Sequence, residues 1–108
     1  MAFTPAAQRT VTNNTTWVEI LTSPSGGSRV TKTITVYNKD TASATPEITH
    51  VVSGVRRTII KLALATNETL VVDDPIVCAV GDSLEISLGG AVSTTQLDVT
   101  VHYAEITA

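Results

Sequence analysis

The sequence has few of the residues on which catalytic and metal-binding sites commonly depend. Of 108 residues, one is cysteine, two are histidine and 4% are aromatic. The single cysteine, Cys78, excludes an intrachain disulfide framework and cannot form a thiolate zinc site by itself. Its apolar neighbours, Ile76-Val77 and Ala79-Val80, indicate a buried structural thiol.

Charged residues are also few. They make up 16% of the chain, and the net charge is -3 at neutral pH. A nucleic-acid-binding protein needs a concentrated basic face, and the only adjacent basic pair is Arg56-Arg57. These neighbours should point to opposite faces of a strand unless the strand bulges. We therefore expect no nucleic acid among the partners.

Long hydrophobic runs are absent too. No stretch of 18 or more apolar residues occurs, and residues 1–9 lack the apolar segment of a signal peptide. We expect no contact with a membrane and synthesis in the cytoplasm. The sequons at Asn13, Asn14 and Asn67 are then interpreted as turn residues. The length suits one buried core and is too short for two.

What the chain has instead is threonine in alternation with aliphatic residues. In residues 30–37, Val30, Lys32, Ile34 and Val36 share one face, and threonines with a tyrosine occupy the other. This period of two predicts a half-buried β-strand in which only Lys32 breaks the pattern. Similar strand patterns occur in six further segments: 15–21, 45–52, 55–64, 68–72 with or without a continuation through 76–78, 83–88 and 96–103.

Turn-forming residues separate these segments, as at Ser53-Gly54 and Gly89-Gly90, and Gly26-Gly27 is expected at a hairpin tip. Seven or eight short strands at this spacing predict an all-β fold, an antiparallel β-sandwich resembling a jelly roll. Residues 1–14 show no periodicity. We expect them to form an extended N-terminal arm, docked on a neighbouring subunit or frayed, ahead of a single β-sandwich domain at 15–108.

One motif has the form of a catalytic sequence. Gly81-Asp82-Ser83-Leu84 resembles the nucleophile motif of the GDSL esterases and lipases, in which the serine precedes a helix. Here Ser83 begins an alternating strand. Asp98 and His102 are four residues apart, which differs from that family's Asp-x-x-His and places them on one strand face about 13 Å apart. We interpret the motif as a turn leading into a strand and expect no enzymatic activity.

No set of side chains has the spacing of a cofactor or metal site. Asp73-Asp74 and Asp82 lack the pattern of a calcium loop and are interpreted as acidic turns. His50 and His102 have no second ligand at a suitable spacing. Gly26-Gly27 is not followed by the lysine and helix of a phosphate-binding loop. We expect no catalytic, cofactor-binding or metal-binding residue.

The aromatic residues are too few to form a stacking platform for a sugar or a single-stranded nucleic acid. Trp17 is expected to pack in the core. Either Trp17 or Tyr37 could instead anchor a protein interface, where aromatic residues contribute strongly to binding.

A series of strand and turn motifs runs from Thr16 to Ile106. It consists of a short strand at 17–21, a Pro/Gly turn with an Arg-containing strand at 23–38, and the segments 64–70, 74–77, 80–84 and 97–101. This series resembles small virion proteins of tailed bacteriophages. The resemblance implies a non-enzymatic, homo-oligomeric structural protein located in the virion. Its expected role is capsid decoration or cement, binding the major capsid protein and stabilising the shell; a neck or tail accessory protein is the alternative.

The composition favours docking to other protein chains independently of that resemblance. Threonine and serine on exposed strands can form hydrogen bonds across an interface at a smaller cost in side-chain entropy than lysine or glutamate. Low charge also weakens the repulsion that keeps strand edges of different copies apart. We expect pairing between copies through a strand edge that the sequence does not specify. A receptor- or carbohydrate-binding sandwich is a further alternative, which requires exposed aromatic residues.

Overall fold

The computed structural model describes residues 2–89 and 97–107, and these form nine β-strands. No helix in this part of the chain has the length and apolar character to cross a bilayer. The strands, in chain order, are β1 (Ala2–Thr12), β2 (Val18–Leu21), β3 (Ser28–Tyr37), β4 (Pro46–Val52), β5 (Val55–Lys61), β6 (Thr69–Val72), β7 (Val77–Ala79), β8 (Ser83–Leu88) and β9 (Leu97–Thr107).

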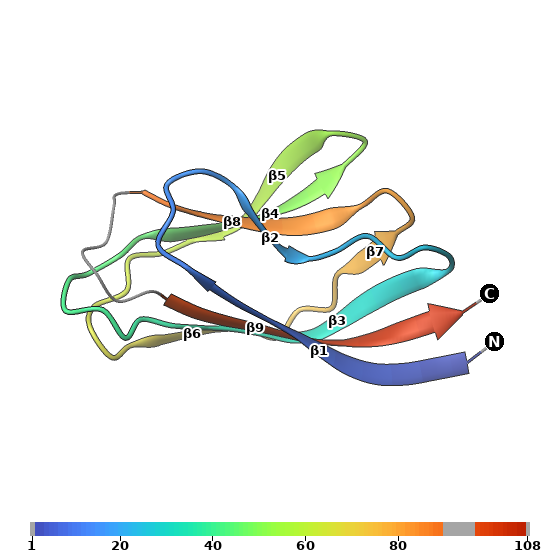
Figure 1. The fold of residues 1–108 in the computed structure, drawn as a ribbon, viewed down its shortest axis with the longest axis horizontal. Helices are drawn as coiled ribbons and strands as arrows, with labels where there is room; N and C mark the ends of the chain where they lie inside the picture. The colour runs from blue at the N-terminus through green and yellow to red at the C-terminus, as the bar shows by residue number, and fades with distance from the viewer. Residues whose placement is uncertain (1, 90–96, 108) are drawn as a thin grey trace.

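The strands form two antiparallel sheets that pack face to face (Figure 1). Sheet A has the order β1-β9-β3-β6, and β7 pairs with β3 beyond the end of β6. Sheet B has the order β2-β8-β4-β5. The first four strands alternate between the sheets, as in a jelly roll. The predicted all-β antiparallel sandwich is confirmed.

The core lies between the sheets and consists of aliphatic side chains from alternate strand positions. Fully burying each such side chain contributes about 1.5–3 kcal/mol relative to leaving it exposed, which makes this layer the main source of stability. The members that are no more than 1% exposed are Ile20, Leu21, Ile34, Val36, Ile48, Leu84, Ile86, Leu97, Val99 and Val101.

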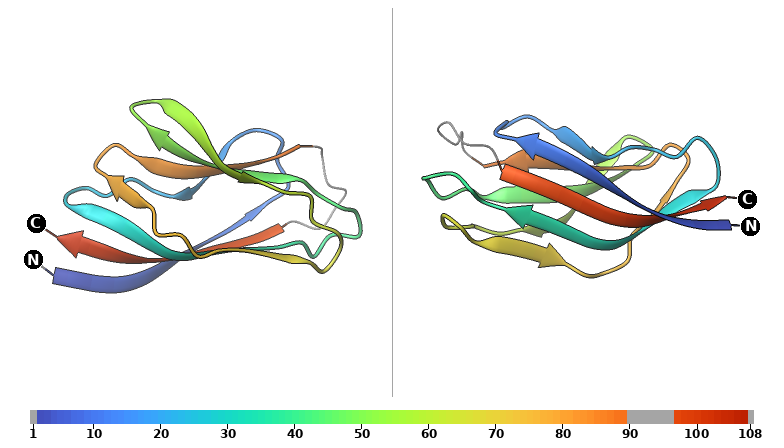
Figure 2. Two further views of the ribbon diagram at one scale, coloured as in Figure 1. Left: turned by 180° about the vertical axis from the view of Figure 1, so that it is seen from behind. Right: turned by 60° about the horizontal axis from the view of Figure 1, so that its bottom comes forward.

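The segment expected to be an N-terminal arm is instead part of the sandwich. Ala2–Thr12 form β1, which is paired along its whole length with β9. Figure 2 shows the two strands running side by side to adjacent chain termini. Their pairing accounts for the ninth strand. The sequence lacks the usual alternation here because the inner face of this edge strand carries small or polar residues such as Thr4, Ala6 and Gln8, while the apolar Phe3 and Val11 lie exposed on its outer face.

The alternation expected across 30–37 is interrupted at Lys32. Thr31 lies opposite Tyr103, and Thr33 lies opposite the adjacent residue, His102. Lys32 is therefore the extra residue of a β-bulge, which exchanges the two faces of the strand on its N-terminal side. As a result Thr31 is buried, at 1% exposure, although the pattern predicted a polar face for it.

Two connections depend on residues with positive φ. Ser53 and Gly54, with φ values of 53° and 78°, form the two-residue turn of the β4–β5 hairpin. The expected hairpin at Gly26-Gly27 is wrong, because β2 and β3 belong to different sheets and their connection crosses between them. Gly27 has a φ of 65°, and a Cβ there would overlap the carbonyl oxygen of Ile106. The expected turn at Gly89-Gly90 lies partly outside the described residues.

Candidate interaction surface

The Gly81-Asp82-Ser83-Leu84 motif forms a turn and the start of β8. The Asp82 N–H donates to the carbonyl oxygen of Ala79 over 3.0 Å, and the Asp82 carboxylate accepts the Ala79 N–H over 3.1 Å. Gly81 has a φ of 91°. Ser83 is the first residue of β8 and is buried. The interpretation of this motif as a turn leading into a strand is confirmed.

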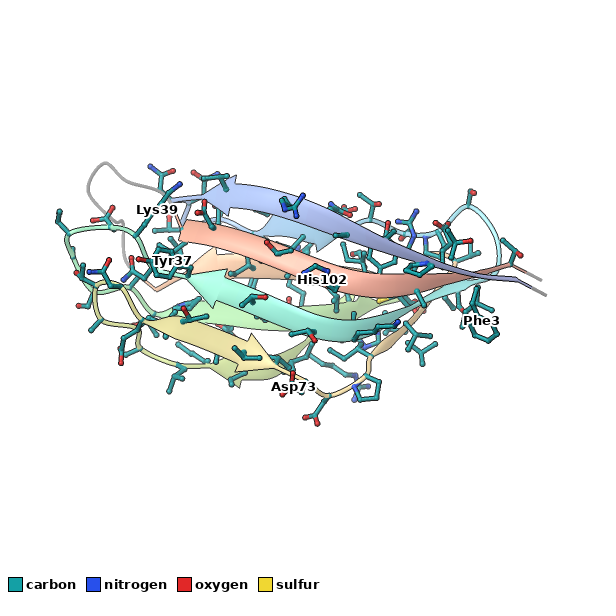
Figure 3. All side chains as sticks on the ribbon, turned by 90° about the horizontal axis from the view of Figure 1, so that it is seen from below. Phe3, Tyr37, Lys39, Asp73 and His102 are labelled. Carbon is teal, nitrogen blue, oxygen red and sulfur yellow. The ribbon has the colours of Figure 1, made fainter. Side chains whose placement is uncertain are left out.

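The two histidines lie on different sheets. His102 is exposed on β9, on the outer face of sheet A (Figure 3), and His50 is on β4 of sheet B. Asp98, also on β9, forms an ion pair with Lys39 in which Oδ1 lies 2.9 Å from Nζ. Within residues 2–89 and 97–107, no three His, Cys, Asp or Glu side chains are grouped so that they could hold a metal ion, and no pocket is found.

Cys78 is fully buried, as the sequence predicted. It lies on β7 opposite Arg29 of β3. Burial, and then the negative charge of Asp82, raise the pKa of the thiol to about 11, while the positive charge of Arg29 acts in the opposite direction. The thiol is therefore protonated at neutral pH and a poor nucleophile.

Arg29 organises a polar cluster at the inner face of sheet A near the chain termini. Its guanidinium lies over the ring of Tyr103, 5.2 Å from the centroid. Nη1 donates to the carbonyl oxygen and the hydroxyl of Thr22 over 2.8 and 2.7 Å, and Nη2 lies 3.4 Å from Oε1 of Glu105. Arg29 thus connects β3 to Thr22, just after β2, and to Glu105 and Tyr103 of β9.

Trp17 is not in the core, and that expectation is wrong. Its side chain is half-buried just before β2, whose core positions are occupied by Ile20 and Leu21. The guanidinium of Arg56 lies 5.2 Å from the Trp17 ring centroid and donates to the Glu85 carboxylate over 2.7 Å. This ion pair offsets the charge of one member of the Arg56-Arg57 pair.

The outer face of sheet A is apolar at the end that carries the termini. Residues opposite one another on adjacent strands share a face, so the pairings of β1, β9, β3 and β7 place several aliphatic residues and Phe3 together on the outside (Figure 3). Phe3 is 66% exposed and Val77 is 57% exposed. We define the outer apolar patch as Phe3, Pro5, Val30, Val77, Ala104 and Ile106.

Three of the four sheet edges carry features that hinder pairing with another chain. β2 has four residues, with a bulge between Glu19 and Leu21. β5 contains three of the chain's seven Lys and Arg residues. β6 and β7 are short and are separated by a segment that includes Asp73-Asp74-Pro75.

The fourth edge, β1, has none of these features. It is 11 residues long, its register with β9 is regular throughout, and it pairs with no other described strand. Its only charged residue is Arg9. Toward sheet B, the side chain of Gln8 on β1 makes a polar contact: its Oε1 accepts the Thr22 N–H over 3.1 Å.

The hydrogen bonds of sheet A show which backbone groups of β1 face the open edge. The N–H of Thr31 points away from β9, toward the segment before β7, to which it donates over 2.9 Å. Because backbone direction alternates along a strand, its neighbour Val30 faces β9 and pairs with Ala104. The next residue of β9, Tyr103, then faces β1, where its partner is Ala6.

It follows that the even-numbered residues of β1 bond to β9 and the odd-numbered residues direct their backbone groups to the open edge. The other end of β3 leads to the same assignment. There the Asn38 N–H points toward the β6 side and donates to the carbonyl oxygen of Glu68 over 3.0 Å. The outward residues, all exposed, are Phe3, Pro5, Ala7, Arg9 and Val11. Pro5 has no N–H, and it occupies one of the positions whose backbone does not bond to β9.

No protein-family model matches the sequence, and no curated protein matches it. The fold is similar to that of a chain in a solved structure of Bacillus endospore appendages, which are described as a family of disulfide-linked pili. The TM-score is 0.58 over 99% of this chain and 88% of that chain, with 11% sequence identity. At this identity the two chains share the fold.

Proposed function

We propose that this chain is a non-enzymatic structural subunit that associates with copies of itself in a larger protein assembly. The observation that carries the proposal is the open edge of β1. Five of its eleven residues direct backbone groups to an edge that pairs with no other described strand, while the other three edges are short, interrupted or positively charged. Such an edge is a template for strand addition by another chain.

The outer apolar patch supports the same proposal. Phe3 of β1, at the open edge, and Val77 of β7, at the other edge of the same sheet, each expose more than half of their surface on the outer face. Exposed apolar groups that are contiguous, in contrast to scattered single residues, mark interaction sites. An interface that uses both the β1 edge and this face would bury backbone and apolar groups together.

Two kinds of assembly fit this role. The fold shared with a Bacillus appendage chain favours a pilus-like filament. The series of motifs that resembles virion proteins of tailed phages favours capsid decoration, with a neck or tail position as the alternative. We propose the structural subunit as the common role and treat the two kinds of assembly as outcomes of one experiment.

Disulfide linkage, named for the Bacillus pili, is not part of the proposal. The only cysteine of this chain is fully buried and its pKa is raised. It could not reach a thiol of another subunit while the sandwich is folded. The association that we propose for this chain therefore involves no disulfide between subunits.

The test combines sedimentation velocity with electron microscopy of the purified full chain over a wide range of concentrations. We expect concentration-dependent oligomers. Regular filaments would favour a pilus-like assembly. Binding to undecorated phage shells, with increased resistance of the shells to heat or chaotrope, would favour decoration. A chain that neither oligomerises nor binds shells contradicts the proposed function.

A further inference from the structure

We infer that two copies of this chain pair through their β1 strands, antiparallel, about a two-fold axis that passes beside Ala7. The inference rests on the proposed function and specifies its first contact. The paired strands would join both copies of sheet A into one continuous sheet. Because the axis is perpendicular to that sheet, both outer apolar patches would lie on the same side of the dimer.

The hydrogen-bond directions restrict the register. Only the odd-numbered residues of β1 face the open edge, so odd residues must lie opposite odd residues of the second copy. When Ala7 lies opposite Ala7, all five odd residues take part, since Phe3 is then opposite Val11 and Pro5 is opposite Arg9. The missing N–H of Pro5 removes one bond from each half, which leaves about eight backbone hydrogen bonds.

Neighbouring registers are poorer. A shift of two residues in one direction leaves Phe3 without a partner among the five outward residues, and a shift in the other direction leaves Val11 without one. Either shift gives about six hydrogen bonds in place of about eight. The backbone alone therefore favours the register centred on Ala7.

The side chains of β1 match themselves in the same register. Phe3 and Val11, 66% and 52% exposed in the single chain, meet on the outer face as an aromatic and β-branched pair, a favourable cross-strand combination. On the inner face Thr4 lies opposite Thr10. Such pairs on both sides of the axis give the strand the two-fold complementarity that a symmetric dimer needs.

The charges of β1 do not oppose this pairing. Arg9 is its only charged residue, and it lies opposite Pro5 of the second copy. The two Arg9 residues are four positions apart across the axis, about 14 Å between Cα atoms from strand geometry. This exceeds the screening length of about 8 Å at physiological ionic strength, so their mutual repulsion is weak.

The first experiment places charges at the axis. Ala7 is exposed and its backbone does not bond to β9, so neither Ala7→Lys nor Ala7→Glu should disturb folding. Each alone sets like charges side by side in the dimer, and sedimentation should show at least a tenfold weaker self-association for each. An equimolar mixture of the two should recover dimers, because opposite charges then meet.

The matched control is Ala79→Lys. Ala79 is exposed on β7, at the opposite edge of the same sheet, and we expect wild-type association for this variant. Circular dichroism of every variant should match the wild type. Loss of association in Ala79→Lys, with Ala7→Lys unaffected, would overturn the pairing while leaving the proposed function intact.

The second experiment tests the register by oxidative cross-linking. Opposite residues in a bonded antiparallel pair have Cα atoms about 5.5 Å apart, which a disulfide can span. We expect Ala7→Cys to form a covalent dimer under mild oxidation and Arg9→Cys, at about 14 Å, to remain uncross-linked. Cross-linking only in Arg9→Cys would overturn the register.

Two further outcomes separate this inference from the function on which it rests. A wild-type chain that forms filaments, with association unaffected by either Ala7 charge variant, would exclude β1 pairing and retain the structural role. A wild-type chain that stays monomeric at every concentration and binds no shell would contradict both.

Discussion

The side-chain amide of Asn38 donates a hydrogen bond to the backbone carbonyl of Leu64 over 3.0 Å, where both residues are buried. The same amide group lies 3.1 Å from the Ala42 carbonyl oxygen and 3.3 Å from that of Ala65, and its oxygen accepts the Asp40 N–H over 3.0 Å. One side chain therefore links the loop after β3 to the segment between β5 and β6. Both halves of the amide are used.

Replacing Asn38 should therefore destabilise the sandwich. Asn38→Ala removes the donor to the Ala42 carbonyl, one of two donors to each of the Leu64 and Ala65 carbonyls, and an acceptor for the Asp40 N–H. We expect the free energy of unfolding to fall by about 2–4 kcal/mol. Asn38→Asp keeps an acceptor for the Asp40 N–H but turns a carboxylate toward carbonyl oxygens. Its deficit relative to wild type should be larger at pH 7 than at pH 4, where the group can be protonated. Urea denaturation measures both, and wild-type stability in Asn38→Ala would contradict the assigned contacts.

Two glycines of positive φ should respond differently to alanine. Gly54→Ala meets no atom within 4 Å and should cost only the left-handed backbone conformation, about 1–2 kcal/mol. Gly27→Ala also places its Cβ against the Ile106 carbonyl oxygen, and we expect a loss of about 3 kcal/mol or more. Thermal and urea unfolding compare the two variants. Equal losses would show that the connection from β2 to β3 adjusts freely.

The threonine at the β3 bulge should matter more than its neighbour on the outer face. The hydroxyl of Thr31 accepts the Ile76 N–H over 2.9 Å. Thr31→Val removes that acceptor at nearly constant volume, so we expect a loss of about 1–3 kcal/mol and faster hydrogen exchange at the Ile76 amide. Thr33→Val, the control, should change stability by no more than about 0.5 kcal/mol. Similar effects of both substitutions would contradict the reversal of faces at Lys32.

The titration of Cys78 should make the free energy of unfolding depend on pH in the alkaline range. Its pKa is raised from 9.0 to about 11 in the folded chain, so the folded state holds the thiol proton more tightly than the unfolded state does. The stability due to this difference is fully present below about pH 9 and is lost as the pH rises through about 11. Cys78→Ser, which does not titrate in this range, should show a smaller decline in unfolding free energy between these values.

The same burial predicts slow modification of the thiol. At pH 8 we expect labelling of native Cys78 by a thiol reagent to be limited by opening of the structure, and labelling in denaturant to be fast. Labelling of the folded chain at the rate of a free cysteine would show that the side chain is accessible. The absorbance of a released chromophore follows the reaction.

Much of the fold was predictable because strand periodicity is a local property. The alternation in 83–88 and 97–101 records which side chains face the core, and the structure buries those aliphatic residues. The apolar neighbours of Cys78 likewise predicted its burial. The motif that resembles a catalytic sequence was correctly interpreted as a turn because an alternating strand follows it directly.

Other features depend on contacts between distant segments. β1 has little internal pattern, and only its register with β9 makes it a strand. Trp17 is large and apolar, yet Ile20 and Leu21 occupy the core positions of β2, and Arg56 from a different strand covers its ring. In the sequence, the bulge at Lys32 is indicated only by one charged residue at a position where the alternating pattern expects an apolar one.

The sequence by itself determined an all-β sandwich with an aliphatic core, a buried single thiol and the turns at Ser53-Gly54 and Gly81-Asp82, because side-chain pattern and turn chemistry act over a few residues. The tertiary structure alone decided which strand edge is open and which residues of β1 offer free backbone groups. Those properties follow from the order of strands in a sheet and from the direction of backbone hydrogen bonds. Both depend on pairing between segments far apart in the sequence, so no local side-chain pattern specifies them.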